Sequence, residues 1–259
     1  MNLQIQCFQM EILHLDKNMN NFNTKEFLLA LRQTLTKTGS EKDRIAGQRF
    51  FKHSVLLYGI KSKVVTEIAN QFYKTELSEL PKSNIFLLCE ELFSSQWLEE
   101  SFLACNWSLQ HKKNYQIEDF DLFEQWINLY VKNWATCDTF CNHNVMELII
   151  KFPNLINRLK EWANSPNLWM RRAAAVTLII PARRGKFLDD IFEIATTMLL
   201  DKEDMVQKGY GWMLKAASNA HLEQVFQFVM QNKAIMPRTA LRYAIEKMPE
   251  NYRKAAMAK

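Results

Sequence analysis

Apolar residues recur along most of the chain at intervals of three and four, the spacing of an amphipathic helix. The pattern begins at Thr24, where TKEFLLALRQTL places apolar residues on one face, at Phe27, Leu28, Leu31 and Leu35. The Thr24 hydroxyl suits the cap of a first helical turn. No segment gives a convincing strand, which would show strict alternation of apolar and polar residues. The pattern therefore predicts an all-α protein.

The same spacing predicts further helices joined by short loops. They are expected at 41–53, from Ser62, at 81–93, 96–110, 117–131 and 134–151, from Pro153, after Asn167, and at 188–200, 202–218, 222–231 and 237–247, with a short tail after them. Proline suits the first turn of a helix and asparagine its N-cap. Residues 1–22 are mixed and polar toward their end. We expect a loose lead-in there and a single domain over residues 23–259.

Three of the expected helices repeat at an interval of about 35 residues. A shift of 36 lays Ser165 on Asp201 and Arg172 on Lys208, and a shift of 35 in the other direction lays Trp134 under Trp169. Helix–turn–helix units of this length stack into curved α-solenoids with a concave face. The repeat therefore favours an α-solenoid superhelix. A helical bundle without repeats is the alternative, because weak periods also arise by chance in helical chains.

Composition and charge narrow the class of protein. Six glycines and six prolines in 259 residues are too few for a β-rich chain with many turns. A net charge of +5 fits an acidic partner such as nucleic acid without proving one. Five scattered cysteines without a C-x-x-C pair indicate reduced thiols. The N-terminus is a poor signal peptide, and no apolar run reaches the roughly 18 residues of a membrane span. We expect a soluble, cytoplasmic protein that does not enter a membrane.

The candidate chemistry is concentrated in the segment VKNWATCD, where Trp134 precedes Asp138 by four residues. Ring and carboxylate at this spacing share one helical face. Such a pair is poor core material and suits a cationic ligand. Taken alone, Asp138 near a helix start is more often a capping or dipole residue. In the register of the repeats, however, Trp134, Asp138, Arg172 and Trp212 can converge on one groove.

Four segments resemble landmarks of the DNA alkylation repair family, the AlkD-like glycosylases built from HEAT-like repeats. They are GQRFFKHSVLLYGI at 47–60, NWATCD at 133–138, NLWMRRAAAV at 167–176 and VQKGYGWMLK at 206–215. Together they span most of residues 40–250. The resemblance implies a solenoid of HEAT-like helix–turn–helix repeats that holds duplex DNA in a basic concave groove.

Carried over by position, the resemblance implies that Asp138 is the catalytic carboxylate. It implies aromatic walls at Trp134 and Trp212, and a DNA-backbone contact beside the lesion at Arg172. Phe50, also expected at the lesion, stands where the family has a tyrosine, so one hydroxyl is missing near the implied site. The implied enzyme is a monomeric DNA glycosylase of base-excision repair. It excises cationic N3- and N7-alkylated purines, such as 3-methyladenine and 7-methylguanine, from double-stranded DNA without a cofactor.

Basic residues provide candidate contacts to the DNA backbone. They are Lys208, Arg171, Lys112, Lys113, Arg183, Arg184 and Arg242. Adjacent helical residues point about 100° apart, so at most one of Arg171 and Arg172 faces the groove, and the register favours Arg172. Contacts of this kind would make binding weaken steeply with salt.

Several residues receive a plainer interpretation. Four tryptophans are expected in the core, at Trp97, Trp107, Trp126 and Trp162. Cys137, Cys141 and His143 match no zinc spacing and lack a fourth ligand, so we expect no metal. A second functional hypothesis also remains open. In it, the chain is a non-catalytic solenoid that binds damaged or branched DNA, or a protein partner, through the same groove.

Overall fold

The computed structural model describes residues 22–258, and every regular element in this range is helical. The lead-in expected over residues 1–22 lies outside the described residues, apart from its last residue. The α-helices are α2 (Thr24–Thr38), α3 (Glu41–Gln48), α4 (Ser62–Phe72), α5 (Lys82–Ser94), α6 (Leu98–Gln110), α7 (Asp119–Tyr130), α8 (Trp134–Phe140), α9 (Met146–Lys151), α10 (Ile156–Trp162), α11 (Leu168–Val176), α12 (Ile179–Arg183), α13 (Leu188–Thr197), α14 (Asp204–Ala217), α15 (Leu222–Asn232), α16 (Arg238–Ile245) and α17 (Glu250–Met257). Shorter turns are the π-helical η2 (Tyr73–Leu77) and η4 (Cys141–Val145) and the 3-10 helical η3 (Lys112–Asn114) and η5 (Pro153–Leu155). The predicted all-α fold is confirmed.

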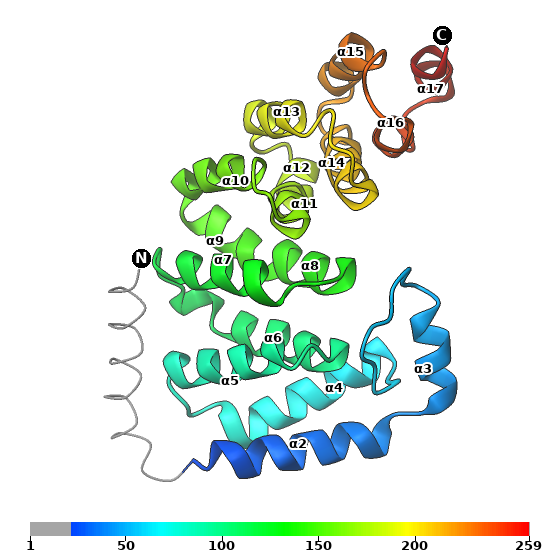
Figure 1. Cartoon of the computed structure of the whole chain (residues 1–259). Coiled ribbons are helices and arrows are strands. Elements are labelled where there is room, and N and C mark those ends of the chain that lie inside the picture. Colours follow the sequence, from blue (N-terminus) through cyan, green and yellow to red (C-terminus); the bar gives the residue numbers. More distant parts are fainter. Residues whose placement is uncertain (1–21, 259) are drawn as a thin grey trace.

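The helices stack in a solenoid-like array. In Figure 1 the chain rises from α2 at the bottom to α17 at the top, with α7, α10 and α13 on one side and α8, α11 and α14 on the other. Helix α11 packs against both α8 and α14, so three successive units are joined through it. Helix α3 and the loop after it stand on the same side of the array as α8. That residues 23–259 form a single domain stays a prediction.

Buried aromatic rings make up much of the core. Trp107, Trp126 and Trp162 are almost completely buried, as predicted. Trp97 is only partly buried, which corrects the expectation for that residue. It lies at the N-cap of α6, where its ring stacks on Tyr58 with the centroids 4.2 Å apart. Residues 56 and 97 also form an isolated bridge, while no part of residues 22–258 forms a strand.

Helix caps fix the register of the repeats. The side chains of Asn133 and Asn167 each accept a backbone N–H at the start of α8 and α11. Glu203 occupies the same position before α14. The spacing is 34 residues from the first cap to the second and 36 from the second to the third. The shift of 36 is therefore confirmed, and the shift of 35 is wrong by one. The residue aligned with Arg172 is Asp138.

The helix predicted over residues 134–151 is continuous but contains the π-helical turn η4. Asn144 lies in that turn and is fully buried. Its amide nitrogen lies within hydrogen-bond distance of Ser108 Oγ at 2.7 Å and Tyr115 Oη at 3.1 Å. The wider turn thus directs a polar side chain from α8–η4–α9 into the packing with α6.

Several helix bounds differ from the predicted ones, most clearly at α3 and in the C-terminal tail. Helix α3 ends at Gln48 instead of His53, because the Gln48 side chain donates to the His53 carbonyl and accepts from Val55 N–H, which closes a loop. The expected C-terminal tail is the helix α17. Its Tyr252 ring packs edge-on against Phe226 with the centroids 4.2 Å apart.

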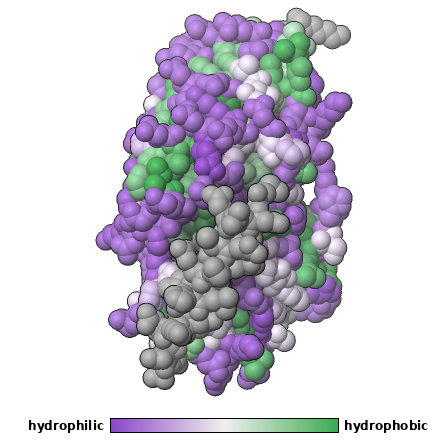
Figure 2. Space-filling view, turned by 60° about the vertical axis from the view of Figure 1, so that its left-hand side comes forward, coloured by the Kyte–Doolittle hydropathy of each residue, from purple (hydrophilic) through white to green (hydrophobic). Residues whose placement is uncertain are grey.

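One face of the molecule is largely polar. Figure 2 shows a face on which hydrophilic residues predominate and apolar patches are small and separate. Among residues 22–258, no helix is long and apolar enough to cross a membrane.

Candidate functional site

A charged pair joins the starts of two neighbouring helices. Arg172, on α11, donates from Nε to Asp138 Oδ1 and from Nη2 to Asp138 Oδ2, each at 2.8 Å. Its Nη1 donates to the carbonyl of Met205, on α14. The side chains of Arg172 and Asp138 are 6% and 14% exposed. One guanidinium therefore ties α8, α11 and α14 together and holds a carboxylate that still reaches the surface.

Small residues allow this approach. Ala173, Ala174 and Ala175 follow Arg172 on α11 and are fully buried. Gly209, on α14, faces the arginine, and a Cβ built there would lie 3.4 Å from Arg172 Cγ. The Arg172 side chain thus occupies space that a larger residue at position 209 would take. Local sequence, through the caps and these small residues, positions the pair.

Burial and pairing act in opposite directions on the acid. Burial raises the pKa of Asp138 above its usual value, and the hydrogen bonds and charge of Arg172 oppose that rise. For Arg172, burial lowers the pKa, but the hydrogen bonds and charge of Asp138 outweigh it and the pKa is raised. The guanidinium is therefore always charged. Each carboxylate oxygen keeps a second lone pair, so a cation or a water can be bound at the exposed edge of Asp138.

Trp134 lies one turn before Asp138 on α8 and is held by the loop after α3. Its Nε1 donates to the carbonyl of Phe50 at 3.3 Å. The Phe51 ring stacks on it, with centroids 5.6 Å apart and planes 25° apart. The Phe50 ring itself is 74% exposed. Phe51, which sequence reasoning missed, is thus the aromatic partner of Trp134. The sequence did offer one indication of this role, because Phe51 follows Phe50 within the segment 47–60 that resembles the family.

A buried carboxylate anchors the end of that loop. Glu99, on α6, is 3% exposed and accepts three backbone N–H groups, from Tyr58, Gly59 and Ile60. Gly59 has a φ of +84°, and a Cβ there would lie 2.3 Å from the carbonyl oxygen of Ser40. Only glycine fits this turn. Sequence reasoning did not identify Glu99.

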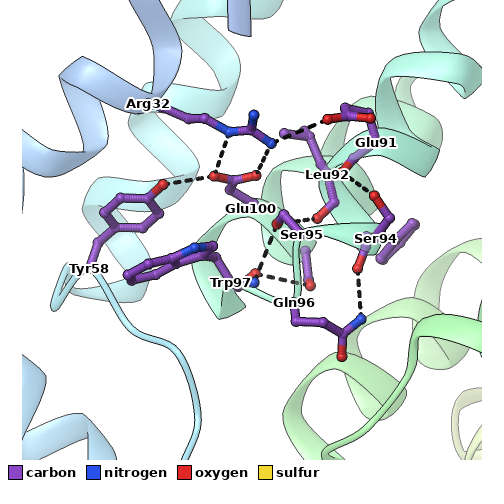
Figure 3. A network of polar contacts seen from close by, with 11 residues as sticks. Arg32, Tyr58, Glu91, Leu92, Ser94, Ser95, Gln96, Trp97 and Glu100 are labelled. Carbon is purple, nitrogen blue, oxygen red and sulfur yellow. Dashed lines mark hydrogen bonds and ion pairs between the residues drawn. The ribbon is translucent and has the colours of Figure 1, made fainter. Parts of the chain in front are cut away.

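The neighbouring acid completes the anchor. Figure 3 shows Glu100 between Arg32 and Tyr58, with the Tyr58 ring lying against Trp97. Arg32 donates two hydrogen bonds to the Glu100 carboxylate at 3.1 and 3.0 Å, and the Tyr58 hydroxyl donates a third at 2.7 Å. Glu100 is fully buried. These contacts fix the loop on α2 and α6, so Phe51 meets Trp134 from a rigid support.

A cavity of about 440 Å³ lies against the stacked rings of Phe51 and Trp134. Its walls include Phe51, Leu57, Phe102 and Trp134, with Asp43 among the polar residues. Asp138 does not line it. Trp134 therefore lines the cavity, whereas Asp138 and Arg172 do not.

The two other residues expected in the groove lie on α14. Lys208 binds Asp204 with Nζ 2.7 Å from Oδ2, and the same oxygen lies 3.5 Å from Lys52 Nζ. Trp212 is one turn further along and is partly buried against the core. Arg172 and Asp138 are brought together as the sequence suggested. A role for Trp212 and Phe50 at a lesion stays a prediction.

The structure gives several basic candidates an internal partner. Arg172 is turned inward, which does not favour its predicted contact with the DNA backbone. Arg171 pairs with Asp201, in the loop between α13 and α14, at 2.6 Å. Lys112 binds Glu147 at 2.7 Å. At a rise of roughly 1.5 Å per residue, Glu147 lies about 14 Å from Asp138 along the helix, and so does its ion pair with Lys112. Lys112 is nevertheless exposed, as are the candidates Lys113, Arg183, Arg184 and Arg242.

No group of three histidine, cysteine, aspartate or glutamate side chains within residues 22–258 is arranged to hold a metal ion. Cys137 and Cys141 are fully buried. Burial raises the pKa of the Cys137 thiol well above its usual range, which disfavours the thiolate that a metal requires.

Comparison with known proteins identifies relatives of the chain. A family model described as DNA alkylation repair enzyme matches residues 31–248. A solved structure, described as a predicted DNA alkylation repair enzyme from Enterococcus faecalis, is similar with a TM-score of 0.74 at 16% sequence identity. The similarity covers 82% of this chain and 98% of the other. Among curated proteins no match was found.

Proposed function

The chain belongs to the DNA alkylation repair enzyme family, and from this premise we propose that it is a DNA glycosylase. Its substrates are cationic N3- and N7-alkylated purines in duplex DNA, such as 3-methyladenine and 7-methylguanine. One observation carries the proposal: the Asp138 carboxylate is held by Arg172 through two hydrogen bonds, beside Trp134 and with one edge exposed.

The chemistry of these lesions requires little of the enzyme. An alkylated purine with a positive charge leaves with the electron pair of the glycosidic bond and becomes neutral, so no acid has to protonate it. A single carboxylate can therefore replace the usual pair of a glycosidase. Positive charge moves onto the deoxyribose as the bond breaks, and Asp138 stabilises it. The same carboxylate orients a water, whose oxygen adds to C1′ and which loses a proton, leaving an abasic site.

Arg172 is a positioning residue in this scheme. It holds the carboxylate in one orientation before the reaction, so the enzyme does not reorganise as the charge develops. Its third hydrogen bond, to Met205, fixes the guanidinium in turn. The raised pKa of Arg172 keeps the guanidinium charged beside the carboxylate.

Trp134 supplies a second source of stabilisation. An indole face attracts a cation by about 0.5–2 kcal/mol, the larger value applying when water is excluded. The contacts with Phe50 and Phe51 hold the ring in place. Ring and carboxylate on one face of α8 thus both favour a nucleotide that carries positive charge.

Incubating the purified protein with duplex DNA that contains 7-methylguanine tests the proposal. Release of the free base, followed by chromatography, is the expected result. Binding of the methylated duplex without release would instead favour the alternative of a non-catalytic DNA-binding solenoid. Alkali added after the reaction cleaves the strand at the abasic site, and the length of the fragments would locate the excised purine.

A further inference from the structure

Two lysines from distant parts of the chain share one carboxylate oxygen. Lys208 Nζ lies 2.7 Å and Lys52 Nζ 3.5 Å from Oδ2 of Asp204. Lys52 belongs to the loop after α3 and precedes Asp204 by 152 positions. Figure 1 shows this loop rising from α3 on the side where α8, α11 and α14 lie. The contact therefore joins the N-terminal part of the array to α14.

We propose that Asp204 occupies the place of a DNA phosphate in the free protein, and that Lys52 and Lys208 bind a backbone phosphodiester when duplex DNA enters. The ligand class is the phosphodiester backbone, without base specificity. The inference rests on the proposed function only in assuming that the protein binds DNA, since the contact needs neither a lesion nor excision.

The location of the cluster suits a phosphate near the lesion. Asp204 is followed by Met205, whose carbonyl accepts a hydrogen bond from Arg172. Arg172 in turn holds Asp138. Asp204, which both lysines contact, is thus the residue before the one whose carbonyl anchors the charged pair. A phosphate bound there would lie at the start of α14, the helix that Arg172 joins to Asp138.

The charges favour an exchange of anions. The hydrogen bond from Lys208 is the largest of the effects that lower the pKa of Asp204, so the carboxylate is ionised at neutral pH. Two ammonium groups and one carboxylate leave a net charge of +1. Asp204 also begins α14, where the free N–H groups of a helix start attract anions. A phosphodiester has two non-bridging oxygens and can accept a hydrogen bond from one lysine on each. In the free protein both lysines contact the same oxygen of Asp204.

The pair is also accessible enough to exchange. The side chains of Lys52, Asp204 and Lys208 are 70%, 38% and 29% exposed. Exposed ion pairs of this kind contribute little to stability, so a strong polyanion can replace the carboxylate. The Lys52 loop also carries Phe51, which stacks on Trp134. Holding Lys52 on the DNA backbone would therefore keep this loop over the site.

Binding of a short undamaged duplex, measured by fluorescence anisotropy between about 50 and 200 mM salt, tests the inference. Lys52→Gln is expected to weaken binding and to reduce the slope of log affinity against log salt by about one. Lys63→Gln is the matched control, because Lys63 is 88% exposed on α4 and, among residues 22–258, pairs only with Glu67. Asp204→Asn is expected to tighten binding by about two- to fivefold, the range of an exposed ion pair. Asp189→Asn, at an exposed aspartate of α13, corrects for the change in net charge.

Equal salt slopes for Lys52→Gln and Lys63→Gln would overturn the inference, as would weaker binding by Asp204→Asn than by Asp189→Asn. Far-ultraviolet circular dichroism of each variant excludes unfolding as the cause. Binding without excision would leave this inference standing and remove the proposed glycosylase. Excision with no response in these variants would do the reverse.

Discussion

Arg172 binds both carboxylate oxygens of Asp138 from a position 34 residues further along the chain, each at 2.8 Å. The two residues occupy the same place in successive units, five residues after the asparagine caps Asn133 and Asn167. Two oppositely charged side chains at equivalent positions of successive units therefore meet across the contact between α8 and α11. Because Arg172 also binds Met205, the site depends on three units at once.

Asp138→Asn is expected to abolish most excision while keeping the fold and DNA binding. Asparagine keeps one oxygen for Arg172 but loses the negative charge that stabilises the sugar cation. The loss of a single preorganised electrostatic group lowers rates by about 10²–10³. Single-turnover release of 7-methylguanine gives the rate, and anisotropy gives the affinity. Asp189→Asn, on the exposed start of α13, is the charge-matched control. An unchanged excision rate in Asp138→Asn would rule out the mechanism.

Excision is expected to fall in acid, with a midpoint above the usual range of an aspartate. Burial raises the pKa of Asp138, with Arg172 opposing, and only the ionised carboxylate stabilises the cation. The folded protein also binds this proton more tightly than the unfolded chain. The contribution of Asp138 to stability is therefore greatest below the unfolded pKa and is lost as pH rises through the folded pKa. Single-turnover rates from about pH 4 to 7, corrected for loss of base from DNA alone, measure the midpoint. A rate that stays constant throughout this range would contradict the assignment.

Glu99→Gln is expected to destabilise the protein by about 1–3 kcal/mol. The amide NH₂ of glutamine cannot accept a hydrogen bond, so at least one backbone N–H group that the carboxylate binds would lose its acceptor. The carboxylate accepts from Gly59 and Ile60 on one oxygen and from Tyr58 on the other. Urea unfolding measures the change in free energy, and hydrogen exchange at residues 58–60 locates it. Glu91→Gln is the control, because Glu91 is 52% exposed and lies 3.6 Å from Arg32. Equal stability of the two variants would mean that Glu99 does not anchor the loop.

Two glycines of α14 are expected to respond in opposite directions to alanine. A Cβ at Gly211 would lie 2.7 Å from Tyr243 Cβ and 2.8 Å from the Ala240 carbonyl oxygen. Such overpacking costs about 1–3 kcal/mol. At Gly209 the nearest atom is Arg172 Cγ at 3.4 Å, an ordinary contact, and alanine gains up to about 1 kcal/mol of helix propensity. Thermal and urea unfolding of Gly209→Ala and Gly211→Ala give both signs. Destabilisation by Gly209→Ala would contradict the prediction and would mean that α11 and α14 cannot separate enough to accept the added methyl group.

Residues that act through local rules could be predicted from the sequence. Asn167 caps a helix because its side chain reaches the next N–H groups, and apolar spacing alone identifies most helices. The proximity of Asp138 and Arg172 follows from equivalent positions in stacked units. The direct pairing of Asp138 with Arg172 could not be predicted. It requires a shift of 34 residues and not 35 between the two units, and the shift depends on the positions of the helix caps.

Contacts from remote parts of the chain could not be predicted. Glu99 and Glu100 look like a solvated charged face, yet their partners come from residues about 40 positions away and from Arg32. Arg171 looks available to DNA until Asp201 is placed beside it. Charge alone does not distinguish a surface cation from one neutralised by an acid from another part of the chain.

The π-helical turn η4 gives the helix of Asp138 one residue more than regular winding needs. Deleting one residue between Phe140 and Met146 would let the segment wind as a regular α-helix, with both ends kept in place. Elsewhere in a helix the same deletion would rotate everything beyond it by about 100°. A relative that lacks this extra residue should therefore align only when a one-residue gap is placed at this turn. An alignment without that gap would pair either Asp138 or the residues after Met146 with the wrong partners.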